Sequence, residues 1–226
     1  MARLTLPLVI DRLKAHHGVQ KAPRLNGPWE MILWENIAYL ADDDRRQQAF
    51  ATLKKTVGTK PEQILSASDD TLLGVTGHGI LAEQFVAKLR KCATIALEDF
   101  DGDLREVLQR PFAKARNALK KFPGIGESGA DKILLFTRSF PLLPLDSNGL
   151  RVLVRLGFAV EQKSYAKTYQ MIQSAVAKET SEDFDWLMQA HMLLRRHGQD
   201  VCKRTKPLCE QCPLAENCVF AQQSER

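Results

Sequence analysis

Long apolar runs are missing from this 226-residue chain. A membrane-spanning helix needs roughly 20 consecutive apolar residues, and no stretch reaches that length, so we expect no membrane segment. The first apolar stretch, residues 4–10, ends after seven residues at Asp11 and Arg12, which is too short and too soon charged for a signal peptide. We therefore expect an intracellular protein, where reducing conditions disfavour a disulfide framework.

Strand-like alternation of apolar and polar residues is also missing, and we find no internal repeat. Apolar residues recur instead at helical spacing. The expected helices cover residues 4–16, 29–40, 45–57, 61–67, 80–96, 104–109, 111–121, 129–140, 150–156, 164–178 and 184–197. We predict an all-α protein with short loops.

Acidic residues are fewer than basic ones. The chain has 32 Lys and Arg against 27 Asp and Glu, which gives a formal charge of +5 and a pI near 9.0. This balance favours a polyanionic partner, although many basic proteins bind no nucleic acid.

The stretch from residue 111 to residue 140 predicts two helices joined by a sharp turn. Pro123 fixes φ, and Gly124 and Gly126 permit the positive φ values of a tight turn. Such a turn places backbone N–H groups at a helix N-terminus, where they can bind an anion. With Lys120 and Lys121 close by, a DNA phosphate is the expected anion; the alternative is an ordinary helical hairpin.

Two carboxylates are candidates for catalysis. Asp146 follows a short apolar segment and stands at the start of an expected helix, where it also suits a plain N-cap. Glu35 lies in the almost wholly apolar stretch 29–40, where burial would raise the pKa of a carboxyl group. It is either a general acid or base facing a pocket, or a glutamate paired with a Lys or Arg.

Four of the five cysteines gather near the C-terminus, at Cys202, Cys209, Cys212 and Cys218. Thiolates at this density in an intracellular chain indicate a metal site. Zinc sites usually pair two short arms, whereas only one close pair is present, so the spacing favours a [4Fe–4S] cluster. Between the first two cysteines lies a basic loop with Lys203, Arg204 and Lys206, which suits either phosphate contact or simple solvation.

The combination of LKKFPGIGESGADKIL, an aspartate 18 residues after Ser128 and the pattern C-x6-C-x2-C-x5-C resembles the helix-hairpin-helix DNA glycosylases of the endonuclease III and MutY type. The resemblance covers nearly the whole chain. It implies a six-helix barrel over residues 28–140 and an iron–sulfur domain made of residues 1–27 and 141–226. It also implies that DNA lies across the groove between the two domains, with one nucleotide flipped out of the duplex.

The resemblance assigns roles residue by residue. Asp146 matches the aspartate that stabilises positive charge on the deoxyribose as the N-glycosidic bond breaks. Gly124, Ile125 and Gly126 match the phosphate-binding turn, and the four cysteines match the cluster ligands. Leu40 lies near the position that fills the gap left by a flipped base, and His78 lies near a wedge position. Both also suit packing contacts.

One departure from the bifunctional pattern predicts the reaction type. Ser128 occupies the place where endonuclease III-like enzymes hold a nucleophilic lysine. A serine there resembles MutY-type enzymes, which use water and leave an abasic site. LDSN also resembles their LDxN, so Asn148 is expected to orient the sugar or Asp146. Glu35 lies near their acid that protonates the departing base, although its neighbours match poorly.

These features together predict a monofunctional glycosylase of base excision repair, closer to the MutY-like or mismatch branch. The expected partner is duplex DNA with a damaged or mismatched base, and the expected location is the cytoplasm, at the nucleoid, as a monomer. The alternatives are a bifunctional glycosylase and lyase that uses another lysine, such as Lys132, and a non-catalytic damage-binding protein. A zinc-bearing helical module is a further alternative.

Overall fold

A computed structural model of the protein describes residues 3–38 and 40–224. Within these residues every regular element is a helix and no strand forms, which confirms the all-α prediction. None of the described helices is both long and apolar enough to cross a membrane. The chain divides into two units, one made of residues 1–22 and 140–226 and the other of residues 23–139. The six-helix barrel expected over residues 28–140 stays a prediction.

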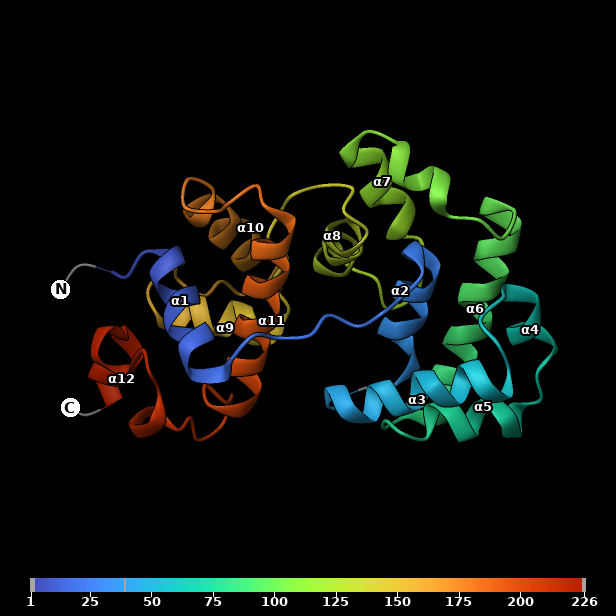
Figure 1. Ribbon diagram of the computed structural model, residues 1–226, viewed down its shortest axis with the longest axis horizontal. Coiled ribbons are helices and arrows are strands. Elements are labelled where there is room, and N and C mark those ends of the chain that lie inside the picture. Colours follow the sequence, from blue (N-terminus) through green and yellow to red (C-terminus); the bar gives the residue numbers. More distant parts are fainter. Residues whose placement is uncertain (1–2, 39, 225–226) are drawn as a thin grey trace. The chain divides into compact units, whose positions relative to one another are not determined.

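The discontinuous unit is built around one long helix, α11. Its helices are α1 (Leu6–His17), α9 (Ser147–Arg155), α10 (Tyr165–Val176), α11 (Phe184–Asp200) and α12 (Val219–Ser224), with 3-10 turns at Cys209–Gln211 and Ala215–Asn217. Helix α11 packs against α9 and α1, so segments far apart in sequence share one core (Figure 1). A Cβ atom added at Gly198 would lie 2.7 Å from the backbone oxygen of Asn148, so the close approach of α11 to α9 requires glycine.

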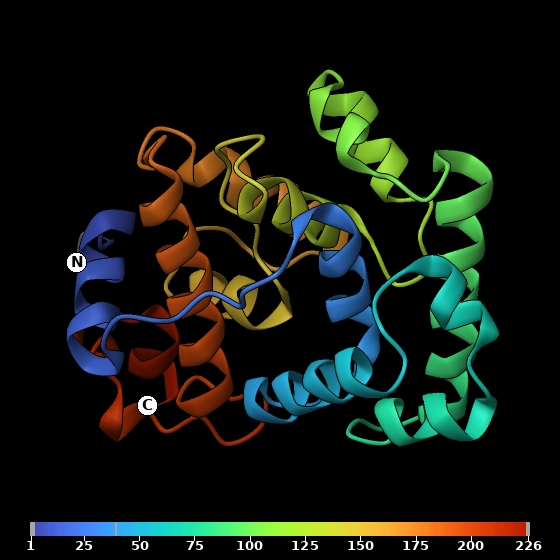
Figure 2. The ribbon, with the colours of Figure 1, turned by 45° about the vertical axis from the view of Figure 1, so that its right-hand side comes forward.

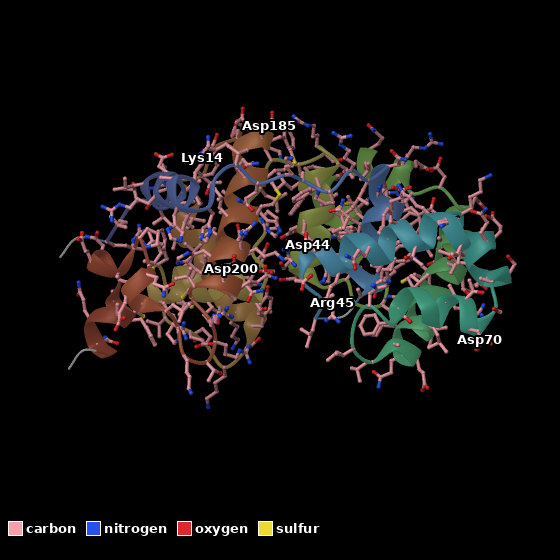
Figure 3. The ribbon with its side chains drawn as sticks, turned by 60° about the horizontal axis from the view of Figure 1, so that its bottom comes forward. Lys14, Asp44, Arg45, Asp70, Asp185 and Asp200 are labelled. Atoms are coloured by element: carbon pink, nitrogen blue, oxygen red, sulfur yellow. The ribbon has the colours of Figure 1, made fainter. Side chains whose placement is uncertain are left out.

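The continuous unit holds α2 (Gly27–Ile37), α3 (Asp43–Thr56), α4 (Pro61–Ser66), α5 (Asp69–Thr76), α6 (Ala82–Phe100), η1 (Arg105–Gln109), α7 (Phe112–Leu119) and α8 (Glu127–Phe136). Helix α6 contacts α2, α4 and α5, as Figure 2 shows for α4 and α6. A core of fully buried Leu, Ile, Val and Ala side chains joins α2 to α3 and α6. At the start of α3, Asp42 accepts a hydrogen bond from the backbone N–H of Arg45. Asp44 and Arg45 lie in the first turn of this helix (Figure 3).

Some helix bounds differ from the expected ones. Helix α2 ends at Ile37 rather than at residue 40, because Ala38 is extended and Leu40 has a φ of 55°. Residue 39 lies outside the described residues. Helix α6 starts at Ala82 rather than at residue 80, and the turn before it follows α5, which ends at Thr76.

Candidate active site

Asp146 is the N-cap of α9, and both of its carboxylate oxygens have partners. Oδ1 accepts hydrogen bonds from the backbone N–H groups of Asn148 and Gly149, at 3.0 and 2.8 Å. Oδ2 lies 3.3 Å from the Asn148 side-chain amide and 3.3 Å from Nε of Arg195, on α11. The side chain stays 24 % exposed. The capping role and an accessible, fixed carboxylate are therefore compatible at this position.

The extended segment before Asp146 is anchored through its backbone carbonyls. The Leu145 carbonyl accepts from the Tyr165 hydroxyl at 2.7 Å, and the Pro144 carbonyl lies 2.8 Å from Nδ1 of His191. The Leu143 carbonyl accepts from the side-chain amide of Gln173. Three contacts from α10 and α11 thus fix the path of the chain that delivers Asp146.

Changing Tyr165 to phenylalanine tests this anchoring. It leaves the Leu145 carbonyl without its donor, and we expect a loss of about 1 kcal/mol in the free energy of unfolding. In a chain of this size, that loss lowers the melting temperature by roughly 2–4 °C. Thermal unfolding followed by circular dichroism measures it, and an unchanged melting temperature would contradict the anchoring role.

Asn148 is held in one orientation by Arg151. A guanidinium nitrogen of Arg151 donates to Oδ1 of Asn148 at 2.9 Å, which turns the amide NH2 group toward Asp146. The same guanidinium donates to the carbonyl oxygens of Gly198 and Cys202. Desolvation by burial lowers the pKa of Arg151. The charges of Cys202 and Asp146 raise this pKa, and those of Arg155 and Arg204 lower it further.

Glu35 is part of a charged pair in the continuous unit. Its Oε2 lies 2.6 Å from Nζ of Lys132, and its Oε1 lies 3.9 Å from a guanidinium nitrogen of Arg46. The side chain is 15 % exposed. The alternative of a glutamate paired with a Lys or Arg is therefore the one that this geometry fits, while a catalytic role stays a prediction. Ser128, on the first turn of α8, lies one helical turn before Lys132.

The turn between α7 and α8 depends on one glycine. Gly124 has a φ of 78°, and a Cβ atom added there would lie 2.6 Å from Oδ1 of the buried Asn36. Ile125 is buried and fixes the turn to the core. Gly126 is the N-cap of α8, and nothing lies within 4 Å of the position its Cβ would take. A side chain would therefore clash at Gly124 and would find free space at Gly126.

Carboxylates pair with the lysines beside this turn. Nζ of Lys120 lies 3.7 Å from Oε1 of Glu127, and Nζ of Lys121 lies 2.8 Å from Oδ2 of Asp99. Glu127 is the first residue of α8. It therefore places a negative charge at the helix end that would otherwise favour an anion.

Removing that charge is expected to strengthen DNA binding. In Glu127→Gln, Lys120 loses its carboxylate partner, and a phosphate meets no repulsion at the start of α8. We expect the affinity for duplex DNA to rise several-fold. The slope of the logarithm of the binding constant against the logarithm of the salt concentration should steepen by up to about the amount that one additional phosphate contact contributes. Fluorescence anisotropy across a salt series measures both. Glu62→Gln, at the first turn of α4, is the matched control; an equal gain in that variant would argue for net charge alone.

Leu40 and His78 both lie in turns. Leu40 is 71 % exposed in a left-handed conformation. His78 is half-buried in a turn that also exposes Ile80 and Leu81. The exposure of Leu40 argues against core packing, and a role for either residue in ligand contact stays a prediction.

The four C-terminal cysteines line one cavity in the discontinuous unit. Burial, partly offset by a hydrogen bond from the Leu214 backbone and reinforced by the charges of the other three cysteines, raises the pKa of Cys212 to about 11. Among the described residues no group of three or more His, Cys, Asp or Glu side chains is arranged to hold a metal ion. Four cysteine thiolates are the donor set of a [4Fe–4S] cluster, and all four line this cavity. The cluster itself stays a prediction.

Arg155 binds the backbone of the basic loop. It donates to the backbone carbonyls of Lys203 and Arg204, at 2.8 and 3.1 Å, and to Sγ of Cys202 at 3.3 Å. The side chains of Lys203, Arg204 and Lys206 are exposed. The loop therefore has a fixed backbone and presents its charges to solvent.

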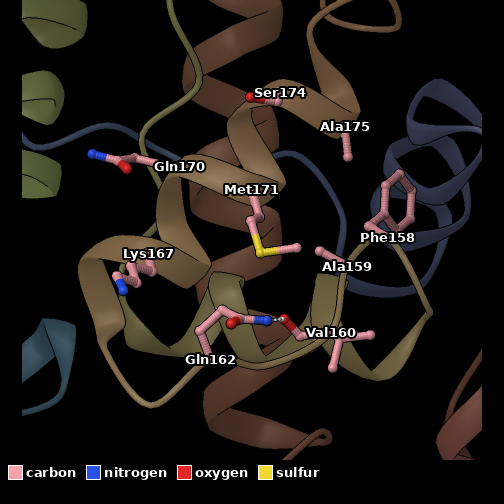
Figure 4. A pocket seen from close by; sticks show the side chains of 9 residues that line it. All are labelled: Phe158, Ala159, Val160, Gln162, Lys167, Gln170, Met171, Ser174 and Ala175. Carbon is pink, nitrogen blue, oxygen red and sulfur yellow. Dashed lines mark hydrogen bonds between the residues drawn. The ribbon is translucent and has the colours of Figure 1, made fainter.

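A second hollow in the discontinuous unit is largely apolar (Figure 4). Its lining residues are Phe158, Ala159, Val160, Gln162, Lys167, Gln170, Met171, Ser174 and Ala175. It contains no carboxylate, thiol or imidazole, so the candidate chemistry lies elsewhere.

No model of a known protein family matches the chain. It is similar to endonuclease III of Sulfolobus acidocaldarius, with 29 % identity over 76 % of this chain and 73 % of that protein. It is also similar to endonuclease III of Rickettsia conorii, with 33 % identity over 46 % of each chain. A third relative, thymine/uracil-DNA glycosylase of Pyrobaculum aerophilum, is 31 % identical over 49 % of each chain.

Solved structures show the same fold. A trapped endonuclease III–DNA covalent intermediate matches with a TM-score of 0.76 and 18 % identity, over 99 % of this chain and 100 % of that one. A thermostable thymine-DNA glycosylase matches with a TM-score of 0.73 and 13 % identity, over 96 % and 97 %.

The chain therefore has the fold of endonuclease III and of a thymine-DNA glycosylase, and α7 and α8 are two helices joined by a short turn. It is similar in sequence to proteins named endonuclease III and shares their fold. Its place among the DNA glycosylases stays a prediction. Because several relatives carry the name endonuclease III, the MutY-like branch stays a prediction.

Proposed function

We propose that this protein is a monofunctional DNA glycosylase of base excision repair. It hydrolyses the N-glycosidic bond of a damaged or mismatched base and leaves an abasic site. The observation that carries the proposal is the fixed, partly exposed carboxylate of Asp146. Ser128, at the position that the resemblance assigns to the nucleophilic lysine, supports the monofunctional reaction.

Asp146 supplies the main electrostatic contribution. Departure of the base builds positive charge on the deoxyribose, and a carboxylate already held in place stabilises that charge without reorganisation. Its two backbone hydrogen bonds and the Arg195 contact favour the ionised form. Asn148, oriented by Arg151, keeps Oδ2 in position.

The groups near Ser128 support hydrolysis by water. A serine hydroxyl does not form a Schiff base. The lysine one helical turn away, Lys132, has its Nζ 2.6 Å from a carboxylate oxygen of Glu35, so its amine is engaged in an ion pair. Glu35 is assigned to assist the leaving base or the attacking water.

The cofactor of this proposal is a [4Fe–4S] cluster held by Cys202, Cys209, Cys212 and Cys218. When bound, such a cluster joins the four thiolates into one cross-link. Arg155 then holds the backbone of the basic loop at Lys203 and Arg204 for phosphate contact. The turn at Gly124 to Gly126 provides a second backbone contact. The partner is double-stranded DNA, bound by a nucleoid-associated, cytoplasmic monomer.

A panel of duplexes tests the reaction type. Each carries one lesion: thymine or uracil opposite guanine, adenine opposite 8-oxoguanine, or an alkylated base. We expect free base from at least one duplex, strand breaks only after alkali, and no covalent complex with borohydride. Strand cleavage without alkali, together with a trapped complex that Lys132→Gln abolishes, would make the protein a bifunctional enzyme. Tight binding without base release would make it a damage-binding protein.

A further inference from the structure

Two histidines and one cysteine ligand of the proposed cluster form a row in the discontinuous unit. Nε2 of His17, the last residue of α1, lies 3.1 Å from Nδ1 of His197 on α11. Nε2 of His197 lies 3.4 Å from Sγ of Cys212. The rings of the two histidines meet edge to face, 5.4 Å apart. Segments separated by 180 positions in the sequence thus converge on one sulfur.

His197 is the central member of this row and is shielded from water. It is 1 % exposed, and its two ring nitrogens are used by two different partners. In the tautomer of His197 that carries its N–H group on Nε2, Nδ1 is an acceptor, so the ring can bind both partners at once. His17 is half-buried and His16 is exposed, so the row leads from the sulfur toward the surface.

The charge of a cluster ligand fixes the direction of both hydrogen bonds. A thiolate bound to iron has no proton and can only accept. His197 must then donate from Nε2 to the sulfur and accept at Nδ1, and His17 must donate from Nε2. We propose that His197, held in this tautomer by His17, is a positioning residue that donates a hydrogen bond to the Cys212 thiolate of the cluster. This inference rests on the cofactor of the proposed function.

The hydrogen bond has two consequences for the cluster. It stabilises the additional negative charge of the more reduced state, so it raises the reduction potential. It also restricts the rotation of the Cys212 side chain, so it slows the loss of iron. Because His17 belongs to α1, the N-terminal helix takes part in both effects.

Electrochemistry on the cluster-loaded protein tests the inference without any glycosylase assay. Protein-film voltammetry gives the reduction potential, and iron release to a chelator, followed by the visible absorption, gives the rate of cluster loss. We expect His197→Leu to lower the potential and to accelerate iron release at least several-fold. His197→Gln, whose amide can still donate to the sulfur, should recover most of both properties. His17→Leu should shift both in the same direction by less.

His16→Leu is the matched control, because His16 contacts the ring of His17 but is exposed and stands outside the row. Should His197→Leu fail to fold, the His17→Leu and His197→Gln proteins still decide the matter. A His17→Leu protein with full iron content and the potential of the unmodified protein would overturn the proposal, as would equal potentials for the leucine and glutamine variants at residue 197. An unmodified protein that binds no iron overturns it together with the cofactor assignment, and leaves base release to be judged separately.

Discussion

Asp146→Asn is expected to reduce base release by roughly 10³-fold, because the substitution removes the negative charge that stabilises the cationic sugar. The fold should persist. Asparagine is as good an N-cap as aspartate, so the backbone N–H groups of Asn148 and Gly149 keep an acceptor. Single-turnover assays on the best lesion of the panel measure the rate, and anisotropy measures DNA affinity, which we expect to change little.

Asp183→Asn provides the control for capping alone. Asp183 is the N-cap of α11 in the same unit, and its carboxylate accepts from the backbone N–H of Trp186 at 2.8 Å. We expect this variant to retain the rate of the unmodified protein. Base release by Asp146→Asn within a few-fold of that rate would show that the carboxylate is only a cap.

Local patterns were sufficient to predict the helices and the position of Asp146. Helical spacing of apolar residues and the Pro-Gly break are properties of neighbouring residues, so α7, the turn and α8 follow from them. The capping position of Asp146 is local as well. The ends of the helices are less predictable: α2 stops before Leu40 because the backbone there turns left-handed, which no residue type in the stretch requires.

The partners of the catalytic candidates could not be predicted from the sequence. Arg195 lies 49 positions after Asp146, and the helical pattern of α11 does not distinguish it from its neighbour Arg196. Tyr165 and His191 contact backbone carbonyls, which leave no pattern in the sequence. The pairing of Glu35 was one of two stated alternatives, and only the packing of α2 against α8 brings Lys132 to it.

Gly124→Ala is expected to damage the turn itself. The added Cβ atom would meet the buried amide of Asn36, and alanine is strained at a φ of 78°. We expect a loss of about 1–3 kcal/mol in the free energy of unfolding and a loss of DNA affinity of at least tenfold. Denaturant unfolding and anisotropy measure the two effects. A variant that retains both would remove the turn from the proposed interface.

Gly126→Ala separates phosphate binding from stability at the same turn. The φ of Gly126 is −88°, which alanine adopts freely, and the space around its Cβ position is open. The free energy of unfolding should therefore stay the same or rise slightly, because alanine lowers the conformational entropy of the unfolded chain. A phosphate bound to the N–H groups at the start of α8 needs that open space, so DNA affinity should fall although the fold is intact. If Gly126→Ala binds DNA as tightly as the unmodified protein, the backbone of this turn does not hold a phosphate, and the loss in Gly124→Ala reflects misfolding alone.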